Sequence, residues 1–204
     1  MKVKTLINEE FSNTCLELSK KISSDFQPDL IIGILTGGGY VGRKIHEYLT
    51  QNQKIYYTEI KIQREGTSKK EKGFLKLILK YSPTFLLNWM RIIESIILEK
   101  KSKKNNPKRE GKIILPPPID SFLKQGNKNI LLVDDAIDSG ATLNLIKEHI
   151  HKNYQNSNIK IAVITITTKE PIISADYYIY NNRTLIRFPW SNDIKKKNAK
   201  RTSC

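Results

Sequence analysis

Three carboxylates lie close together in one stretch of the chain, and the residues before them indicate where they would sit. Asp134 and Asp135 directly follow the apolar residues 130–133, and Asp138 comes shortly afterwards. A short apolar run of this kind is typical of a strand buried on both faces, so we expect the acids at the carboxyl end of a strand. Two adjacent acids there can accept hydrogen bonds from neighbouring sugar hydroxyls, or help to hold a cation that a polyphosphate brings.

The residues after the third acid favour a phosphate site. They are small or hydroxylic, and a helical pattern with Leu143, Ile146 and Ile150 on one face follows them. The N-terminus of a helix offers unpaired backbone N–H groups and a partial positive charge, which suit a phosphate. The expected phosphate loop consists of Ser139, Gly140, Ala141 and Thr142. The alternative is an ordinary strand-to-helix turn with solvated acids, whereas a P-loop is excluded because no Gly-Lys-Ser/Thr follows.

A glycine triplet follows a second apolar run. Residues 30–35 predict another buried strand, and Thr36 leads from it into Gly37, Gly38 and Gly39. Consecutive glycines after a strand indicate a backbone that needs unusual conformations or that a ligand approaches closely. A flexible turn is the other interpretation, and the triplet alone does not decide between them.

The motif around the acids resembles a known signature. Residues 133–142 look like the phosphoribosyl pyrophosphate motif of the type I phosphoribosyltransferases, and residues 28–34 are similar to that family's approach to its pyrophosphate loop. The resemblance implies that Asp134 and Asp135 orient the ribose hydroxyls and, through the substrate, help to hold Mg²⁺. It also implies that Asp138 takes or holds the proton of the base, while residues 139–142 hold the 5-phosphate.

The expected pyrophosphate loop departs from the family at one position. Backbone N–H groups of residues 37–39 would bind the leaving pyrophosphate, but Thr36 stands where the family usually has Arg or Lys. One cationic donor is therefore missing from this loop.

The end of the chain resembles the purine branch of the family. Lys169, the residues 176–178 and the sequence Phe-Pro-Trp at 188–190 look like the base-binding hood of xanthine and hypoxanthine-guanine phosphoribosyltransferases. There the lysine binds the oxygen on the six-membered ring of the purine, whereas a solvated loop lysine is the alternative. Leu185 stands nearest to the usual stacking aromatic. The resemblance thus implies purine salvage, by transfer of a phosphoribosyl group to hypoxanthine, guanine or xanthine.

The resemblance also implies the fold that must position these residues. We expect an α/β type I phosphoribosyltransferase fold, with a mainly parallel sheet flanked by helices and a small C-terminal hood at about residues 168–190. The 204 residues suit a single domain over the whole chain. Further strands are predicted at residues 54–62, 159–167, 176–180 and 184–188.

The positive charge of the chain lies mainly outside these motifs. The net charge is +15, and residues 61–112 hold fifteen Lys and Arg against five Asp and Glu, while residues 195–204 form a basic tail. We interpret about residues 66–112 as a basic insertion. Its apolar residues 85–98 predict a helix, for which we favour packing on the domain or in a homodimer contact over a membrane surface.

Two other functions stay open at this point. A regulatory protein could sense phosphoribosyl pyrophosphate and bind nucleic acid through the basic insertion, and Thr36 favours it. A membrane-surface scaffold with a vestigial pocket is the second, but the intact acidic motif and Lys169 argue against it. The cysteines Cys15 and Cys204 suggest neither a metal site nor a disulfide framework. With no leader-like apolar run before Glu9, we expect a cytoplasmic protein.

Overall fold

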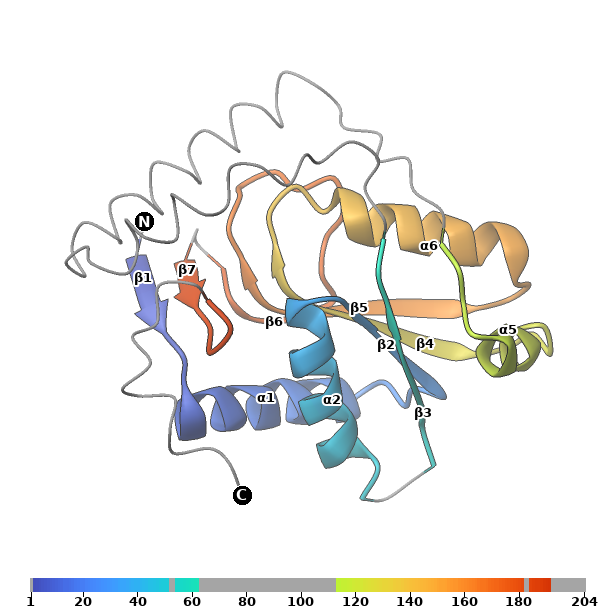
Figure 1. Cartoon of the computed structure of the whole chain (residues 1–204), viewed down its shortest axis with the longest axis horizontal. Helices are drawn as coiled ribbons and strands as arrows, with labels where there is room; N and C mark the ends of the chain where they lie inside the picture. The colour runs from blue at the N-terminus through green and yellow to red at the C-terminus, as the bar shows by residue number, and fades with distance from the viewer. Residues whose placement is uncertain (1, 52–53, 63–112, 182–183, 192–204) are drawn as a thin grey trace.

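The computed structural model describes residues 2–51, 54–62, 113–181 and 184–191. The basic insertion, its expected helix at 85–98 and the basic tail lie outside these ranges. Within them, five parallel strands form a sheet in the order β3-β2-β4-β5-β6 (Figure 1). The bounds are Leu30–Ile34 for β2, Tyr56–Ile60 for β3, Asn129–Ile137 for β4, Asn158–Ile166 for β5 and Tyr177–Tyr180 for β6.

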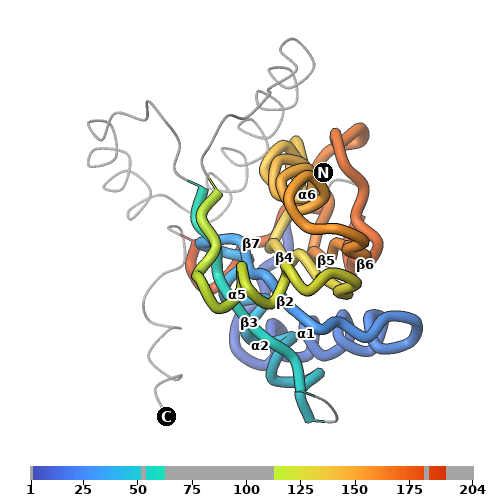
Figure 2. The backbone as a smooth tube through the Cα atoms, turned by 90° about the vertical axis from the view of Figure 1, so that its right-hand side faces the viewer, coloured from blue at the N-terminus to red at the C-terminus, as the bar shows by residue number. Residues whose placement is uncertain are grey.

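Helices cover both faces of this sheet, as the end-on view shows (Figure 2). Helices α1 (Asn8–Ser23) and α2 (Gly37–Leu49) pack on one face, and α5 (Pro117–Leu123) and α6 (Ala141–Asn153) on the other. The strands supply both cores because successive side chains alternate between faces: Leu131 packs with α1 and α2, whereas Leu132 packs with α5 and α6. This burial on both faces explains why β2 and β4 read as continuous apolar runs.

A second, two-stranded sheet joins the two ends of the chain. Strand β1 (Lys2–Thr5) pairs in parallel with β7 (Thr184–Arg187). Of the two C-terminal strands expected in the hood, only β7 lies in this small sheet. Strand β6 belongs to the main sheet, where it pairs in parallel with β5. The backbone N–H of Ile161 within β5 also donates to the carboxylate of Asp176, directly before β6, at 2.8 Å.

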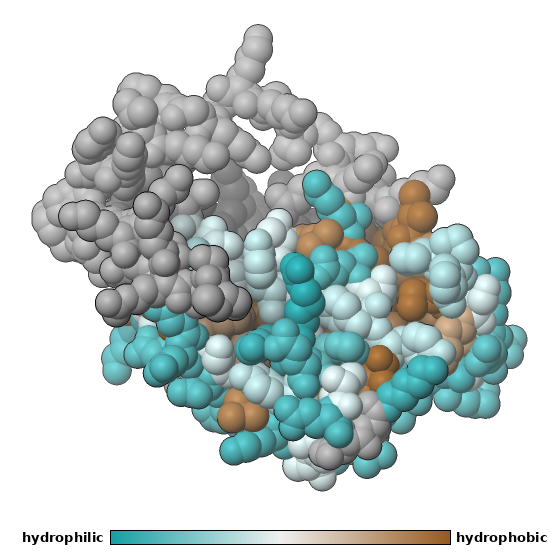
Figure 3. Space-filling model, turned by 60° about the horizontal axis from the view of Figure 1, so that its bottom comes forward, coloured by the Kyte–Doolittle hydropathy of each residue, from teal (hydrophilic) through white to brown (hydrophobic). Residues whose placement is uncertain are grey.

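The described surface carries few large apolar side chains. The face shown in Figure 3 is mainly hydrophilic, with hydrophobic residues in separate small areas. Leu35 and Tyr40, which flank the glycine triplet, are among the exposed large hydrophobic residues. No helix within the described ranges is long and apolar enough to cross a membrane.

Candidate active site

The three acids lie at a step in the sheet. Strand β2 stays paired with β4 only as far as Gly33 and Val133, whereas β4 remains paired with β5 up to Ile137. From Asp134 onward, one edge of β4 therefore has no neighbouring strand in the part of the chain that the structure describes. In the sheet, β3 lies on one side of β2 and β4 on the other, so the strands that follow β2 in the chain proceed in opposite directions from it. Ligands usually bind at such a point, where the strand order reverses. The strand itself continues past the acids, where we expected it to end.

The glycine triplet fills this step. It forms the first turn of α2, and its residues are buried. A Cβ atom on Gly37 would collide with the Asp135 carboxylate, and one on Gly38 would lie 2.5 Å from the Val133 carbonyl oxygen and 2.7 Å from Asp134 Cα. The triplet is therefore required for close approach, not for flexibility, and what approaches it is the acidic strand of the same chain.

The two adjacent acids are held close together, and both residues are half-buried. Asp134 Oδ1 accepts the backbone N–H of Asp135 at 2.9 Å. Burial raises the pKa of Asp134 well above its ordinary value, and the neighbouring Asp135 carboxylate raises it further. Burial also raises the pKa of Asp135, while the indole N–H of Trp190 opposes that rise. A cation or a hydroxyl donor that reaches this pair would therefore be bound favourably.

Asp138 lies at the end of β4 and is oriented by the next strand. Its Oδ1 accepts a hydrogen bond from the hydroxyl of Thr167, directly after β5, at 2.5 Å. Its side chain is otherwise exposed, and its charge contributes to the raised pKa values of Asp134 and Asp135. Asp138 thus belongs to the same site as the pair and keeps access to a ligand.

The expected phosphate loop is formed as a helix N-terminus. Gly140 has a φ of 76°, a left-handed conformation that favours glycine, and α6 starts at Ala141. The Ser139 hydroxyl accepts the N–H of Ala141 at 3.3 Å, and the Ser139 carbonyl accepts the N–H of Ile172 at 2.9 Å. The segment after β5 is thereby attached to this loop.

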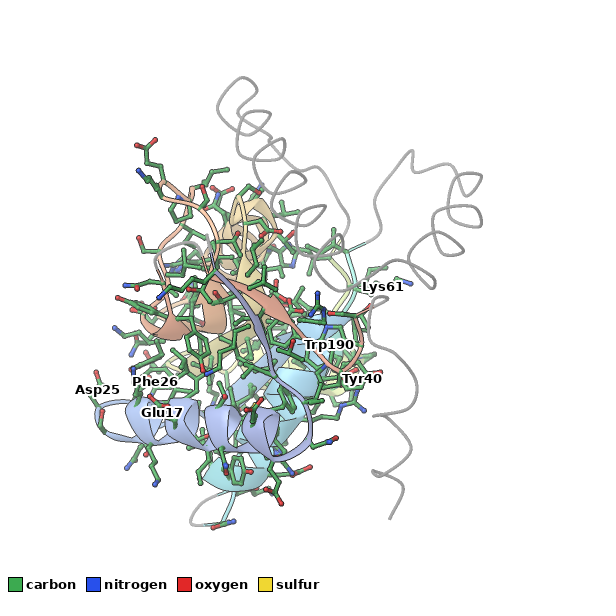
Figure 4. All side chains as sticks on the ribbon, turned by 90° about the vertical axis from the view of Figure 1, so that its left-hand side faces the viewer. Glu17, Asp25, Phe26, Tyr40, Lys61 and Trp190 are labelled. Atoms are coloured by element: carbon green, nitrogen blue, oxygen red, sulfur yellow. The ribbon has the colours of Figure 1, made fainter. Side chains whose placement is uncertain are left out.

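The basic residues nearest in sequence to Thr36 are used elsewhere. Arg43 Nε lies 3.0 Å from Glu59 Oε1, and Lys44 Nζ lies 2.7 Å from Glu47 Oε2. Lys61, in contrast, directly follows Ile60, whose carbonyl accepts the N–H of Leu35 beside Thr36 at 2.9 Å. The exposed Lys61 therefore directly follows β3, the strand next to the glycine turn, and Figure 4 shows it on the same side of the molecule as Tyr40 and Trp190.

Several residues of the site escaped the sequence analysis as site residues. Tyr57 has its hydroxyl 2.9 Å from the Gly39 carbonyl oxygen and 2.8 Å from Glu59, so β3 supports the glycine turn. Trp190 donates its indole N–H to Asp135 Oδ2 at 3.1 Å. For Tyr57 the only signal in the sequence was the acid Glu59 within a strand, and for Trp190 it was the Phe-Pro-Trp triplet. Neither signal indicates a contact with the acidic motif.

The site geometry agrees with a comparison of the whole sequence with protein-family models. The model described as "Phosphoribosyl transferase domain" matches residues 5–196. The chain belongs to this family. No curated protein gives a significant match.

Solved structures of phosphoribosyltransferases share the fold. A purine phosphoribosyltransferase from Pyrococcus horikoshii Ot3 aligns with a TM-score of 0.60 at 20% identity, over 94% of this chain and 95% of the other. A xanthine-guanine-hypoxanthine phosphoribosyltransferase from Helicobacter pylori aligns with a TM-score of 0.58 at 18% identity, over 97% and 98% of the two chains. A hypoxanthine phosphoribosyltransferase from Staphylococcus aureus aligns with a TM-score of 0.53 at 18% identity, over 85% and 73%. These likenesses confirm the type I phosphoribosyltransferase fold.

The two residues expected to bind the base are placed less directly than the acids. Lys169 is exposed in the segment after β5, the same segment that Ile172 attaches to the phosphate loop. Leu185 is buried in β7 beside Val3 of β1. Its neighbours Ile186 and Phe188 pack into the core under α1 and α2, so Leu185 projects from the opposite face of the strand. Both assignments stay predictions.

The acid pair fits a metal ion that arrives with a substrate. No group of three or more His, Cys, Asp or Glu side chains that could hold a metal ion occurs in the described ranges. Two adjacent carboxylates with raised pKa values suit Mg²⁺, which typically uses one or two carboxylates together with substrate phosphates.

Proposed function

We propose that this phosphoribosyltransferase chain transfers a phosphoribosyl group from phosphoribosyl pyrophosphate to a 6-oxopurine, with release of pyrophosphate. The observation that supports this most strongly is the pair Asp134 and Asp135 at the step between β2 and β4. A glycine turn packs on one side of the pair, and the N-terminus of α6 follows it in the chain. Sites for a diphosphate, a sugar and a monophosphate therefore adjoin, in the order in which the substrate carries these groups.

Each part of the substrate has a matching group. Asp134 and Asp135 would accept hydrogen bonds from the two ribose hydroxyls, and loop 139–142 would hold the 5-phosphate with backbone N–H groups. The glycine turn would bind the pyrophosphate, with Lys61 of the neighbouring strand as the cation that Thr36 does not supply. Mg²⁺, when bound with the substrate, would neutralise charge on the departing pyrophosphate.

The reaction breaks the bond between the ribose C1 and the pyrophosphate oxygen and forms a bond from C1 to a ring nitrogen of the base. The base loses the proton of that nitrogen, and Asp138 would take or hold it. Thr167 orients the Asp138 carboxylate for this role. Lys169 would donate to the 6-oxo group of the base, a contact that a 6-amino group cannot accept, while Leu185 would pack against the ring.

A panel of bases tests this function. The protein is incubated with phosphoribosyl pyrophosphate, Mg²⁺ and hypoxanthine, guanine, xanthine or adenine, and nucleoside monophosphates are separated by chromatography. We expect product from at least one 6-oxopurine and none when a chelator removes Mg²⁺. Adenine is the matched control, because it differs from hypoxanthine at the 6-position that Lys169 would read. Binding of phosphoribosyl pyrophosphate without any nucleotide product would contradict the enzymatic role and favour a sensing protein.

A further inference from the structure

Trp190 stands in a tight turn directly after the small sheet. The N–H of Ser191 donates to the Phe188 carbonyl at 2.9 Å, and the Ser191 hydroxyl accepts the N–H of Phe188 at 2.9 Å. These two bonds close the turn around Pro189 and fix where the indole leaves the backbone. Trp190 is therefore held from the hood side of the molecule, although its side chain reaches the acidic motif.

The indole ring contacts aromatic rings from three parts of the chain. It stacks on Tyr40, with ring centroids 4.8 Å apart and an angle of 9° between planes, and on Phe188, at 4.8 Å and 4°. Phe11 of α1 meets it edge-on at 5.5 Å. Tyr40 is the residue directly after the glycine triplet. The stack thus joins the turn after β7 to the first turn of α2.

The polar edge of the same ring contacts the acid pair. The indole N–H donates to Asp135 Oδ2 at 3.1 Å, and the missing Cβ of Gly37 leaves the space in which this carboxylate lies. Stacking on Tyr40 and Phe188 would be served equally by phenylalanine. What tryptophan adds is the N–H donor, which favours the ionised form of Asp135 beside Asp134.

We propose that Trp190 is a positioning residue for phosphoribosyl pyrophosphate, since its N–H holds Asp135 Oδ2 and leaves Oδ1 to accept a ribose hydroxyl. This inference rests on the proposed function. It makes the ribose site depend on the hood, because Trp190 belongs to the hood turn while it orients a carboxylate of β4. Trp190 acts only through Asp135, so its loss should affect ligands that carry the ribose and spare those that do not.

The test compares two ligands in one variant. Trp190→Phe keeps an aromatic ring and removes the donor, and binding of phosphoribosyl pyrophosphate and of free pyrophosphate is measured by calorimetry with Mg²⁺. A hydrogen bond to a charged group contributes enough that we expect phosphoribosyl pyrophosphate to bind about 10- to 100-fold more weakly. Affinity for pyrophosphate, which has no ribose, should stay within about twofold. Phe11→Leu is the matched control, because it removes a ring contact of Trp190 but keeps the donor, and it should spare both affinities.

The outcomes separate this inference from the proposed function. If the unmodified protein binds no phosphoribosyl pyrophosphate, the function fails and the role of Trp190 fails with it. If the unmodified protein binds phosphoribosyl pyrophosphate, two results would show that only the positioning role is wrong. Trp190→Phe could bind both ligands as tightly as the unmodified protein, or its affinity for both could fall equally. Should Trp190→Phe not fold, Trp89→Phe leaves Trp190 as the sole tryptophan. Saturation with phosphoribosyl pyrophosphate should then change its fluorescence emission more than saturation with pyrophosphate does, and equal responses would overturn the inference.

Discussion

Replacement of Gly38 by alanine distinguishes a crowded glycine turn from a flexible one. In a flexible turn, alanine would stabilise the first turn of α2, because glycine in a helix is less favourable by about 1 kcal/mol. In the structure the added Cβ would lie 2.5 Å from the Val133 carbonyl oxygen and 2.7 Å from Asp134 Cα. These are backbone atoms of a central strand and cannot swing aside, so α2 must move away from β4.

The expected size of the effect follows from a comparison with Gly42 in the same helix. A Cβ on Gly42 would come no closer than 3.3 Å to its neighbours, Gly33 and Tyr57. Both alanines gain similar helix propensity, but Gly38→Ala must push backbone apart much further than Gly42→Ala. Overpacking of this kind costs about 1–3 kcal/mol. For a chain of this size each kcal/mol changes the melting temperature by about 2–4 °C. We therefore expect Gly38→Ala to melt about 2–12 °C below Gly42→Ala.

Thermal unfolding followed by circular dichroism measures this difference, and calorimetry measures the affinity for phosphoribosyl pyrophosphate. Gly38→Ala should also bind the substrate more weakly, because its methyl group displaces Asp134, whereas Gly42→Ala should bind as the parent does. A Gly38→Ala protein that melts at or above the temperature of Gly42→Ala would show that the turn has room, and the account of the step between β2 and β4 would be wrong.

Three further substitutions test the acids and the pyrophosphate loop. Asp138→Asn should lower turnover by about 10²- to 10⁴-fold with little change in affinity for phosphoribosyl pyrophosphate; unchanged turnover would remove Asp138 from the mechanism. The folded-state pKa of Asp134 is raised above its ordinary value of 3.8. Ionisation of this carboxyl therefore lowers the stability of the folded protein as the pH rises above that value. At pH 7 and with a chelator present, Asp134→Asn should therefore raise the melting temperature, and this gain should disappear below about pH 4. The same variant should bind the substrate more weakly. An unchanged melting temperature at pH 7 would contradict the raised pKa of Asp134. Thr36→Arg should tighten pyrophosphate binding, measured by product inhibition. If Lys61 already supplies the cation, Thr36→Arg alone should change nothing, and adding Thr36→Arg to Lys61→Ala should tighten the binding that Lys61→Ala weakens.

The elements that bury an apolar face could be predicted from the sequence. Helix α6 buries Leu143, Ile146 and Ile150 as its spacing indicates, and β2 is buried along its whole length. The helix follows from its apolar periodicity and the strand from a continuous apolar run, and both patterns depend mainly on burial. The same principle located the acids, because an apolar run that stops at charged residues marks the place where a buried strand comes near solvent.

What escaped prediction depends on contacts between distant segments. The run of apolar residues ends at Val133, yet β4 continues to Ile137 because β5 remains its partner on one side. Asp134 and Asp135 interrupt the apolar pattern without ending the strand, since the glycine first turn of α2 covers them in place of an apolar helix face. Strand β6 lies in the main sheet beside β5, where the carboxylate of Asp176 accepts a backbone N–H of β5. No local pattern records such pairings.

The distribution of charge around the acid pair indicates what the pair can bind. Arg43 and Lys44 are paired with carboxylates of their own surroundings, so they do not neutralise the acid pair. Burial keeps the pKa values of Asp134 and Asp135 raised, and the charge of neighbouring carboxylates adds to this: Asp135 and Asp138 for Asp134, and Asp138 for Asp135. A bound substrate with its cation would relieve this cost to the folded protein. Among the described residues, this half-buried pair of acids has no basic partner, so it is poorly suited to stabilising a fold and well suited to binding hydroxyls and a cation. The glycine turn and Trp190 serve the same end, because both hold these carboxylates in place without supplying a charge.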